Sequence, residues 1–297
     1  HLEIQDRLIK EAKNQPIWLK FTFRCKEIPE GDVFLVVEEP QKQRITVNGM
    51  LLSAAPAGYY LDRSFEKLPV AGMLRTGENE IILAREFRNP GRVYEVKNDP
   101  TIHEAEANRV TVETELESIY LLGNFRVESE GKVIEKERRA FSVAGDFTVA
   151  RPHADAVIEN LAVDGYPFFA GSITLEKAFE LTPEDLKPGC RIIVSFTRPD
   201  AVVTKVAVNG AAPSVFLWAP YEADITAQAH AGKNTLAVTL TNSCRNLLGP
   251  HHHTAGELYS VGPFSFLKGD GSAWEDRYNL VRLGLENGIA IRVEKAL

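Results

Sequence analysis

Hydrophobic and polar residues follow one another along most of the chain in short stretches, which Gly, Pro or Asn residues separate. The stretches alternate with a period of two residues or stay apolar for a few positions, as strands with a buried face do. Short strands at this spacing favour a β-sandwich or a β-barrel. The clearest stretches in the first half of the chain are residues 21–23, 33–37, 44–47 and 80–84.

The N-terminal segment follows a different pattern. Leu2, Ile4, Leu8 and Ile9 lie among charged residues, at the spacing of one helix face. Because Pro16 disfavours a continuing helix, we expect a short amphipathic helix that ends before it.

The strand pattern returns in the second half of the chain together with its turn residues. Three pairs of segments share an offset of 161 residues, and a fourth pair has an offset of 155. Repetition at nearly one offset predicts two related modules. The pairs are Val47-Asn48-Gly49 with Val208-Asn209-Gly210, Tyr60 with Tyr221, Leu122-Gly123 with Leu283-Gly284, and Gly77-Glu78-Asn79 with Gly232-Lys233-Asn234.

The repeated Asn-Gly pairs have a physical reason to follow strands. Both central residues of a type I′ turn need a positive φ, which Asn tolerates and Gly adopts without steric cost. We therefore expect hairpin turns at Asn48 and Asn209. The repeat divides the chain into a first sandwich with connecting strands at residues 1–158 and a second sandwich at residues 159–297, with strands over 172–181 and 289–293.

Composition narrows the classes of partner. The 297 residues carry a formal net charge of −7 in mixed-sign segments, without a Lys/Arg block that could neutralise a row of phosphates, so we expect no nucleic-acid partner. No apolar run approaches the roughly 20 residues that cross a bilayer, so we expect no membrane span. The chain opens with His1 rather than Met, as a processed or excised piece would, and its compartment therefore stays open.

The three cysteines, Cys25, Cys190 and Cys244, are odd in number and far apart, so we interpret them as core thiols rather than disulfide or zinc ligands. His251-His252-His253 raises the question of a metal. Adjacent residues of an extended segment point to opposite sides, so only His251 and His253 could share an ion, with Glu257 as a third ligand. A loop that packs against the protein is the favoured alternative. No loop has the spacing of a known calcium motif, so we assign no metal ligands, and we expect no cofactor.

Two sets of segments in the second half of the chain can be compared with known families. The first set is Val208-Asn209-Gly210, Pro220-Tyr221-Glu222-Ala223-Asp224-Ile225-Thr226 and Gly232-Lys233-Asn234; the second is Gly165-Tyr166-Pro167-Phe168-Phe169-Ala170-Gly171 and Arg245-Asn246-Leu247-Leu248-Gly249-Pro250-His251-His252. The first set resembles the sugar-binding, galactose-binding-like jelly roll of family 2 glycoside hydrolases. The second set resembles, more closely, the C-terminal accessory region of large bacterial α-L-rhamnosidase-like glycoside hydrolases. The resemblance implies two tandem galactose-binding-like jelly-roll sandwiches that lie outside a catalytic barrel.

Glycoside hydrolysis normally needs two carboxyl groups at a fixed separation, one of them kept protonated by an apolar setting. The acidic runs at residues 38–39, 113–117 and 135–137 lie in polar segments, so we expect them to be solvated and not catalytic. Asp224, just before Ile225-Thr226, is expected to cap backbone amides.

Aromatic side chains are the usual platforms for sugar rings, while polar groups bind the hydroxyls. Trp274 lies in a polar, Gly-containing segment and is the best candidate for stacking. Trp218 is a second candidate, although its apolar neighbours favour burial. Asp270, His251 and His253 complete the set of candidate carbohydrate-binding residues.

The main hypothesis is a non-catalytic accessory pair of sandwiches that belongs to a multidomain glycoside hydrolase and packs on the catalytic barrel of the same polypeptide. An autonomous carbohydrate-binding module for a plant or microbial glycan is the alternative. A complete hydrolase of unfamiliar type, working through His251, Asp270 or Glu275, is a third and weaker one.

Overall fold

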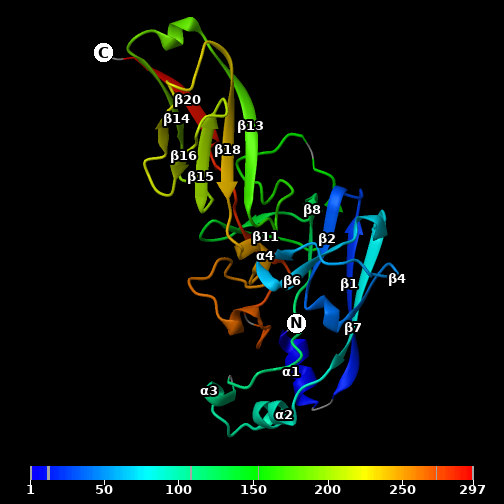
Figure 1. Cartoon of the computed structure of the whole chain (residues 1–297). Helices are drawn as coiled ribbons and strands as arrows, with labels where there is room; N and C mark the ends of the chain where they lie inside the picture. The colour runs from blue at the N-terminus through cyan, green and yellow to red at the C-terminus, as the bar shows by residue number, and fades with distance from the viewer. Residues whose placement is uncertain (1, 12–13, 108, 153, 272, 296–297) are drawn as a thin grey trace. The chain divides into compact units, whose positions relative to one another are not determined.

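A computed structural model describes residues 2–11, 14–107, 109–152, 154–271 and 273–295. In these residues the strands form five sheets and the helices are short, which confirms the all-β class (Figure 1). The N-terminal helix is present as α1 (Leu2–Lys10). None of the described helices combines the length and the apolar character that crossing a bilayer requires. The chain divides into two compact units, residues 1–128 with 147–152 and residues 129–146 with 153–297.

Unit 1 is built from two sheets with the strand orders β4-β3-β7-β1-β12-β9 and β5-β6-β2-β8. Within the first sheet, β1 and β7 pair along their whole lengths in antiparallel register. The strands are β1 (Gln15–Cys25), β2 (Glu30–Glu38), β3 (Arg44–Val47), β4 (Met50–Leu51), β5 (Tyr59–Tyr60), β6 (Asp62–Pro69), β7 (Gly77–Phe87), β8 (Tyr120–Asn124), β9 (Arg126–Ser129) and β12 (Phe147–Ala150), with 3-10 turns η1 (Pro40–Lys42) and η2 (Ala71–Met73).

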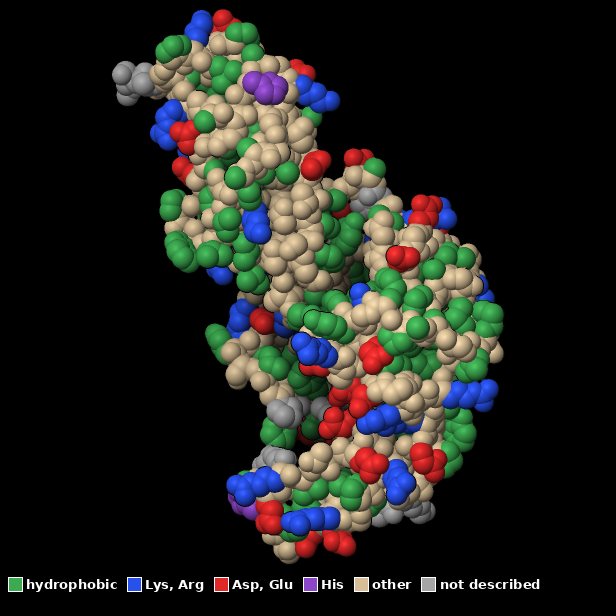
Figure 2. All heavy atoms as spheres, viewed as in Figure 1, with side chains coloured by type: hydrophobic (Ala, Val, Ile, Leu, Met, Phe, Trp, Pro, Cys, Tyr) green, Lys and Arg blue, Asp and Glu red, His purple; other side chains and the backbone are tan. Residues whose placement is uncertain are grey.

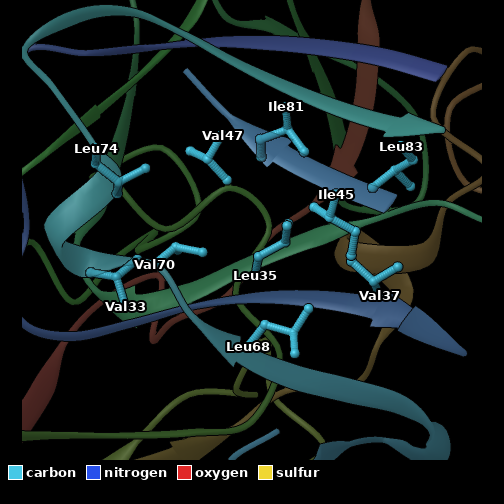
Figure 3. Close-up of a cluster of buried hydrophobic side chains, with 10 residues drawn as sticks. All are labelled: Val33, Leu35, Val37, Ile45, Val47, Leu68, Val70, Leu74, Ile81 and Leu83. Carbon is cyan, nitrogen blue, oxygen red and sulfur yellow. The ribbon is translucent and has the colours of Figure 1, made fainter. Parts of the chain in front are cut away.

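The two sheets of unit 1 enclose a shared apolar core (Figure 3). β2 and β6 contribute from one sheet, and β3 and β7 contribute from the other. Because inward-facing positions of both sheets meet, the alternation seen in the sequence becomes the inside and the outside of a sandwich. The residues are Val33, Leu35, Val37, Ile45, Val47, Leu68, Val70, Leu74, Ile81 and Leu83.

Unit 2 contains three sheets, β16-β15-β18-β13, β17-β14-β20 and β10-β11-β19. Phe196 at the end of β14 contacts Phe216 at the end of β16 with ring centroids 5.1 Å apart, which joins the first two sheets face to face. The strands are β10 (Ile134–Glu135), β11 (Ala140–Val143), β13 (Ser172–Leu181), β14 (Cys190–Phe196), β15 (Val203–Val208), β16 (Ser214–Phe216), β17 (Glu222–Asp224), β18 (Gly232–Thr241), β19 (Tyr278–Val281) and β20 (Ile289–Lys295), with η3 (Pro183–Leu186), α4 (Arg245–Leu248) and η4 (Pro263–Phe266).

The two sandwiches have the same topology. The order β4-β3-β7-β1 is matched strand for strand by β16-β15-β18-β13, and β6-β2-β8 is matched by β17-β14-β20. Each pair of matched strands is also antiparallel to its neighbours in the same way. The duplication predicted from the turn residues is thus confirmed at the level of strand order.

The repeated asparagines make the same hydrogen bonds in both units. Asn48 donates to Asn79 Oδ1 at 2.9 Å, and Asn209 donates to Asn234 Oδ1 at 2.8 Å. Asn48 and Asn209 have φ values of 51° and 52°, and the glycines after them have φ values of 80° and 75°. The expected positive-φ Asn-Gly turns are therefore confirmed at both places.

Two of the other sequence matches are wrong. Val70 N donates to Val33 O in unit 1, and Ile225 N makes the equivalent bond to Ile192 O in unit 2. Val70 therefore corresponds to Ile225 at an offset of 155, the same offset that relates Gly77 to Gly232. Tyr221 then corresponds to a position in β6, whereas Tyr60 lies in β5. Leu122-Gly123 likewise lies in β8, but Leu283-Gly284 precedes β20, the counterpart of β8.

The course of the chain differs from the expected division at residue 158. Residues 129–146 belong to unit 2, because β11 pairs with β19 from Ala140↔Val281 to Val143↔Tyr278. β12 then returns to unit 1 and pairs with β1 in parallel. A parallel partner from a distant part of the chain leaves no local sequence pattern, which is why the crossing was not predicted.

The sequence pattern also gave no sign of the helices α2 (Gly91–Asn98) and α3 (Glu104–Ala107), which follow β7. Val93 of α2 is buried in a second apolar cluster with Ile9, Ile17, Phe87 and Leu116. α1 packs in this same cluster, so the N-terminal helix is held by unit 1.

Candidate functional site

The segment between β18 and β19 in unit 2 is long and mostly irregular, yet it is fixed to the sheet. Asn246 is buried, donates to Val281 O at 2.9 Å and accepts from Val281 N at 2.8 Å. Arg245 forms an ion pair with Glu257 at 2.6 Å. This segment can therefore present side chains in defined positions without regular secondary structure.

His251 is part of the packing in this segment. Its Nε2 lies 2.8 Å from Asn246 O, and its ring contacts Phe168 and Tyr278 with centroid distances of 5.7 and 5.6 Å. Burial lowers its pKa to about 4, although the Asn246 carbonyl works in the opposite direction. His251 is thus a half-buried residue that is neutral at pH 7, and it does not line the neighbouring cavity.

That cavity has a volume of about 200 Å³. The ring of His252 stacks on Trp274 with centroids 4.7 Å apart and an interplanar angle of 26°. His253 pairs with Trp274 in an isolated β-bridge, and the indole of Trp274 donates to Asp276 at 3.3 Å. The lining residues are His252, His253, Phe264, Ser265, Leu267, Ala273 and Trp274.

The hydrogen bonds of His252 and His253 indicate which nitrogen of each neutral ring carries the proton. Nδ1 of His252 lies 3.2 Å from Glu275 O and from Arg277 O, and since carbonyls only accept, this nitrogen carries the proton. Nδ1 of His253 accepts from Ala255 N at 3.2 Å, so its proton is on Nε2. In the neutral rings His252 thus offers an acceptor and His253 a donor.

The chemistry of this cavity suits a sugar ring. Phe264 and Trp274 supply apolar surface, and the side chain of Phe264 is 77% exposed. A sugar presents C–H faces to aromatic rings and hydroxyls to groups such as His252, His253 and Ser265. A volume of about 200 Å³ is below the roughly 300 Å³ of common ligand pockets, so the site fits one ring that stays partly in solvent.

The other sequence candidates lie outside the cavity. Asp270 is exposed on the loop before Trp274. Trp218 lies between β16 and β17 and is 74% exposed, so the expectation that its apolar neighbours bury it is wrong. Of the five candidates, the structure brings Trp274 and His253 together. His252 and Phe264 were missed. His252 stacks on Trp274 and Phe264 lines the same cavity, and both are tertiary features that no spacing in the sequence indicates.

Three glutamates of unit 1 form a close cluster that the sequence pattern did not predict. Glu38, Glu115 and Glu117 bring carboxylate oxygens within 4.8 Å of one another. Burial raises the pKa of Glu38 and of Glu117, and repulsion by neighbouring carboxylates adds to it. The expectation that these runs are fully solvated is therefore wrong for Glu38 and Glu117, because Leu19 and Leu83 pack beside them.

The space at these carboxyl groups decides what they can do. The cavity that Glu38, Glu115 and Glu117 line has a volume of about 10 Å³, roughly enough for one water molecule. A sugar ring needs far more room, and a glycosidase pair must lie on both sides of its bond. Arg85 closes the site from one side, with its Nη1 donating to Glu115 O at 3.4 Å. As it stands, the trio has no place for a glycan.

Two smaller expectations can be compared with the structure. Asp224 accepts hydrogen bonds from Thr226 N and Oγ1, which with Arg191 lower its pKa to about 2, so its capping role is confirmed. Cys25 is a buried free thiol, while Cys190 and Cys244 are free and half-buried. Among the described residues, three potential metal ligands converge only at Glu38, Glu115 and Glu117 and not at the histidine run.

The chain was compared with protein-family models, with curated proteins and with solved structures. No protein-family model matches the chain, and no curated protein matches it. Among solved structures, a rhamnosidase from Novosphingobium sp. PP1Y matches 99% of this chain and 26% of its own, with 15% identity and a TM-score of 0.35. A β-glucuronidase from Bifidobacterium dentium matches 41% of this chain and 21% of its own, with 18% identity and a TM-score of 0.26.

A β-D-mannosidase from Dictyoglomus thermophilum matches 80% of this chain and 26% of its own, with 14% identity and a TM-score of 0.25. The chain thus spans about a quarter of the length of these solved structures. Identities and TM-scores this low do not carry an activity from those enzymes to this chain, whose function must be argued from its own residues.

Proposed function

We propose that this chain is a non-catalytic, sugar-contacting pair of β-sandwiches that belongs to a glycoside hydrolase and accompanies its catalytic barrel. The observation that carries the sugar contact is the cavity at Trp274, where stacked aromatic surface lies beside a histidine donor and a histidine acceptor. The place beside a barrel rests on the motif resemblance and on the duplicated sandwich.

The absence of a catalytic role is supported by the state of the carboxyl groups. Glu38 and Glu117 have the raised pKa that a catalytic acid needs, but the space beside them is about 10 Å³. Near the Trp274 cavity, Glu275 pairs with Lys136 at 3.1 Å and accepts from Asn279 at 2.8 Å. The Glu275 carboxylate is thus already engaged by a cation and an amide.

Binding is tested by titrating the chain with L-rhamnose and D-galactose while NMR shifts or heats are recorded. We expect saturable binding of at least one sugar at roughly millimolar affinity, as suits a single ring. Trp274→Ala should abolish it, because the stacking surface is removed. Trp218→Ala is the matched control, since Trp218 is exposed but outside the cavity. Binding that survives Trp274→Ala, or that fails for both sugars, would reject the sugar contact.

Catalysis is tested separately with aryl rhamnosides and aryl galactosides. We expect no turnover above that of buffer. Turnover that is lost in Glu38→Gln or in Glu117→Gln would reject the non-catalytic proposal and make the acidic trio an active site.

The same cavity also favours the second candidate, an autonomous carbohydrate-binding module. The two roles differ in strength and breadth of binding. An array of plant and microbial glycans that gives strong signals, lost in Trp274→Ala, would favour the module. A silent array together with weak monosaccharide binding would favour the accessory pair.

A further inference from the structure

A cavity of unit 1 lies beside α2 and α3 and has a volume of about 580 Å³. This is within the roughly 300 to 1,000 Å³ of small-molecule sites. Arg92 and His103 line it, together with Glu106, Arg109 and Val110. Figure 2 shows basic, acidic and histidine side chains gathered over this segment.

Two arginines of this cavity are available for a ligand. Within the described residues, the guanidinium groups of Arg92 and Arg109 make no hydrogen bond or ion pair. Two other arginines of unit 1 are already bound to backbone carbonyls, Arg75 to Glu78 O at 2.8 Å and Arg126 to Arg151 O at 2.8 Å. A guanidinium fork without a partner is suited to bind a carboxylate through two parallel hydrogen bonds.

The charge of the lining limits the ligand. Arg92 and Arg109 contribute two positive charges and Glu106 one negative charge, which leaves one positive charge to be neutralised. A singly charged carboxylate balances it, whereas a doubly charged sulfate or phosphate would leave a repelling excess beside Glu106.

The remaining lining adds one directed polar group and an apolar wall. Nδ1 of His103 accepts from Ala105 N at 3.1 Å, so the neutral ring has its proton on Nε2 and can donate it. Val93 is buried and Val110 is half-buried, and both line the cavity. Such a wall takes up the uncharged body of a ligand while the arginines hold its charge.

We propose that this cavity binds a small molecule that carries one carboxylate, with Arg92 and Arg109 as its anchors. The site belongs to unit 1 and does not rest on sugar contact at Trp274 in unit 2. The carboxylate could come from a sugar acid or from a simple organic acid, and the two sources are separated by experiment.

The experiment is an NMR titration of the full chain at low ionic strength with D-glucuronate, propionate, D-glucose and sulfate. We expect saturable shifts of α2 and α3 amides with D-glucuronate. Similar binding of propionate identifies the carboxylate alone as the ligand group, and its failure identifies a sugar acid; both outcomes support the site. Equal binding of D-glucose, tighter binding of sulfate, or no binding of either carboxylate would overturn it.

Variants test the anchors. Arg92→Ala and Arg109→Ala should each weaken carboxylate binding by about tenfold or more, because each removes a charge-assisted pair. Glu106→Gln should tighten it, because a competing negative charge is removed. Lys97→Ala, at the last turn of α2 and outside the cavity lining, is the control and should leave affinity unchanged. Weaker binding in Glu106→Gln, or unchanged binding in both arginine variants, contradicts the assignment.

Discussion

At the scale of single residues, the buried asparagines Asn79 and Asn234 do the same structural work. Each side chain accepts from another asparagine and from a backbone amide, and each donates to two backbone carbonyls. They are 0% and 1% exposed. A buried amide with all four bonds made holds the loop before the strand and the hairpin turn in one geometry.

Replacing either asparagine should therefore be costly. Asn79→Ala and Asn234→Ala should each lower the free energy of unfolding of their unit by about 3 kcal/mol, because backbone groups are left buried without partners. Chemical denaturation followed by circular dichroism measures this. Asn287→Ala, which removes one exposed hydrogen bond to Thr197, should cost far less. Equal effects of the buried and exposed changes would contradict the role.

His251 makes the stability of unit 2 depend on pH. Its pKa falls from 6.5 to about 4 on folding. Between these two pH values the unfolded chain therefore binds a proton at His251 that the folded unit does not bind. The unit is then most stable above pH 6.5 and loses up to about 3 kcal/mol as the pH falls to 4. Denaturation of the chain and of His251→Gln at several pH values should show a shallower acid loss in the variant. Parallel curves of stability against pH for the two proteins would contradict this role of His251.

At the scale of elements, two glycines of unit 2 differ in the space that a side chain would find. Gly210 has a φ of 75° and open space at its Cβ position, so a side chain there meets only the backbone preference. Gly284 leaves no space, because a Cβ would lie 2.2 Å from Ile158 O. The second glycine permits a close approach of two backbone segments that a turn glycine does not need.

Alanine at these two positions should separate the two causes. Gly210→Ala should destabilise unit 2 by about 1 kcal/mol, the cost of a left-handed residue with a side chain. Gly284→Ala should cost several times more, since the 158–159 backbone must move. Thermal unfolding of the two variants gives the comparison, and a milder effect of Gly284→Ala would show that this backbone yields easily.

At the scale of the molecule, both charge signs are spread over the face seen in Figure 2, in keeping with the net charge of −7. The titrating interior groups differ between the units. Unit 1 contains Glu38 and Glu117, whose pKa burial raises, and unit 2 contains His251, whose pKa burial lowers. Protonation of Glu38 and Glu117 should therefore stabilise unit 1, whereas protonation of His251 should destabilise unit 2.

The unit 1 response can be isolated with Glu117→Gln. A carboxyl group with a raised pKa binds its proton more tightly in the folded state, so stability falls as the pH rises from the ordinary value of 4.5 through the raised one. Glu117→Gln should raise the unfolding temperature of unit 1 at pH 7 and reduce its rise on acidification. Glu113→Gln, at an exposed position, should change neither. A lower unfolding temperature in Glu117→Gln would contradict the burial cost.

The sequence by itself determined the features that local chemistry controls. The alternation of hydrophobic and polar residues predicted the strands, and the strand predicted at residues 172–181 has the observed bounds of β13. The turns were predicted at Asn48 and Asn209, because few residue types adopt a positive φ. The same reasoning predicted the loop position of Trp274.

Only the tertiary structure decided which distant residues meet. The parallel pairing of β12 with β1, the stacking of His252 on Trp274 and the approach of Glu38 to Glu117 join positions far apart in the chain or on different elements. Such contacts depend on how whole strands and loops pack, which no short stretch of sequence encodes. For the same reason the exposure of Trp218 followed from the fold and not from its apolar neighbours in sequence.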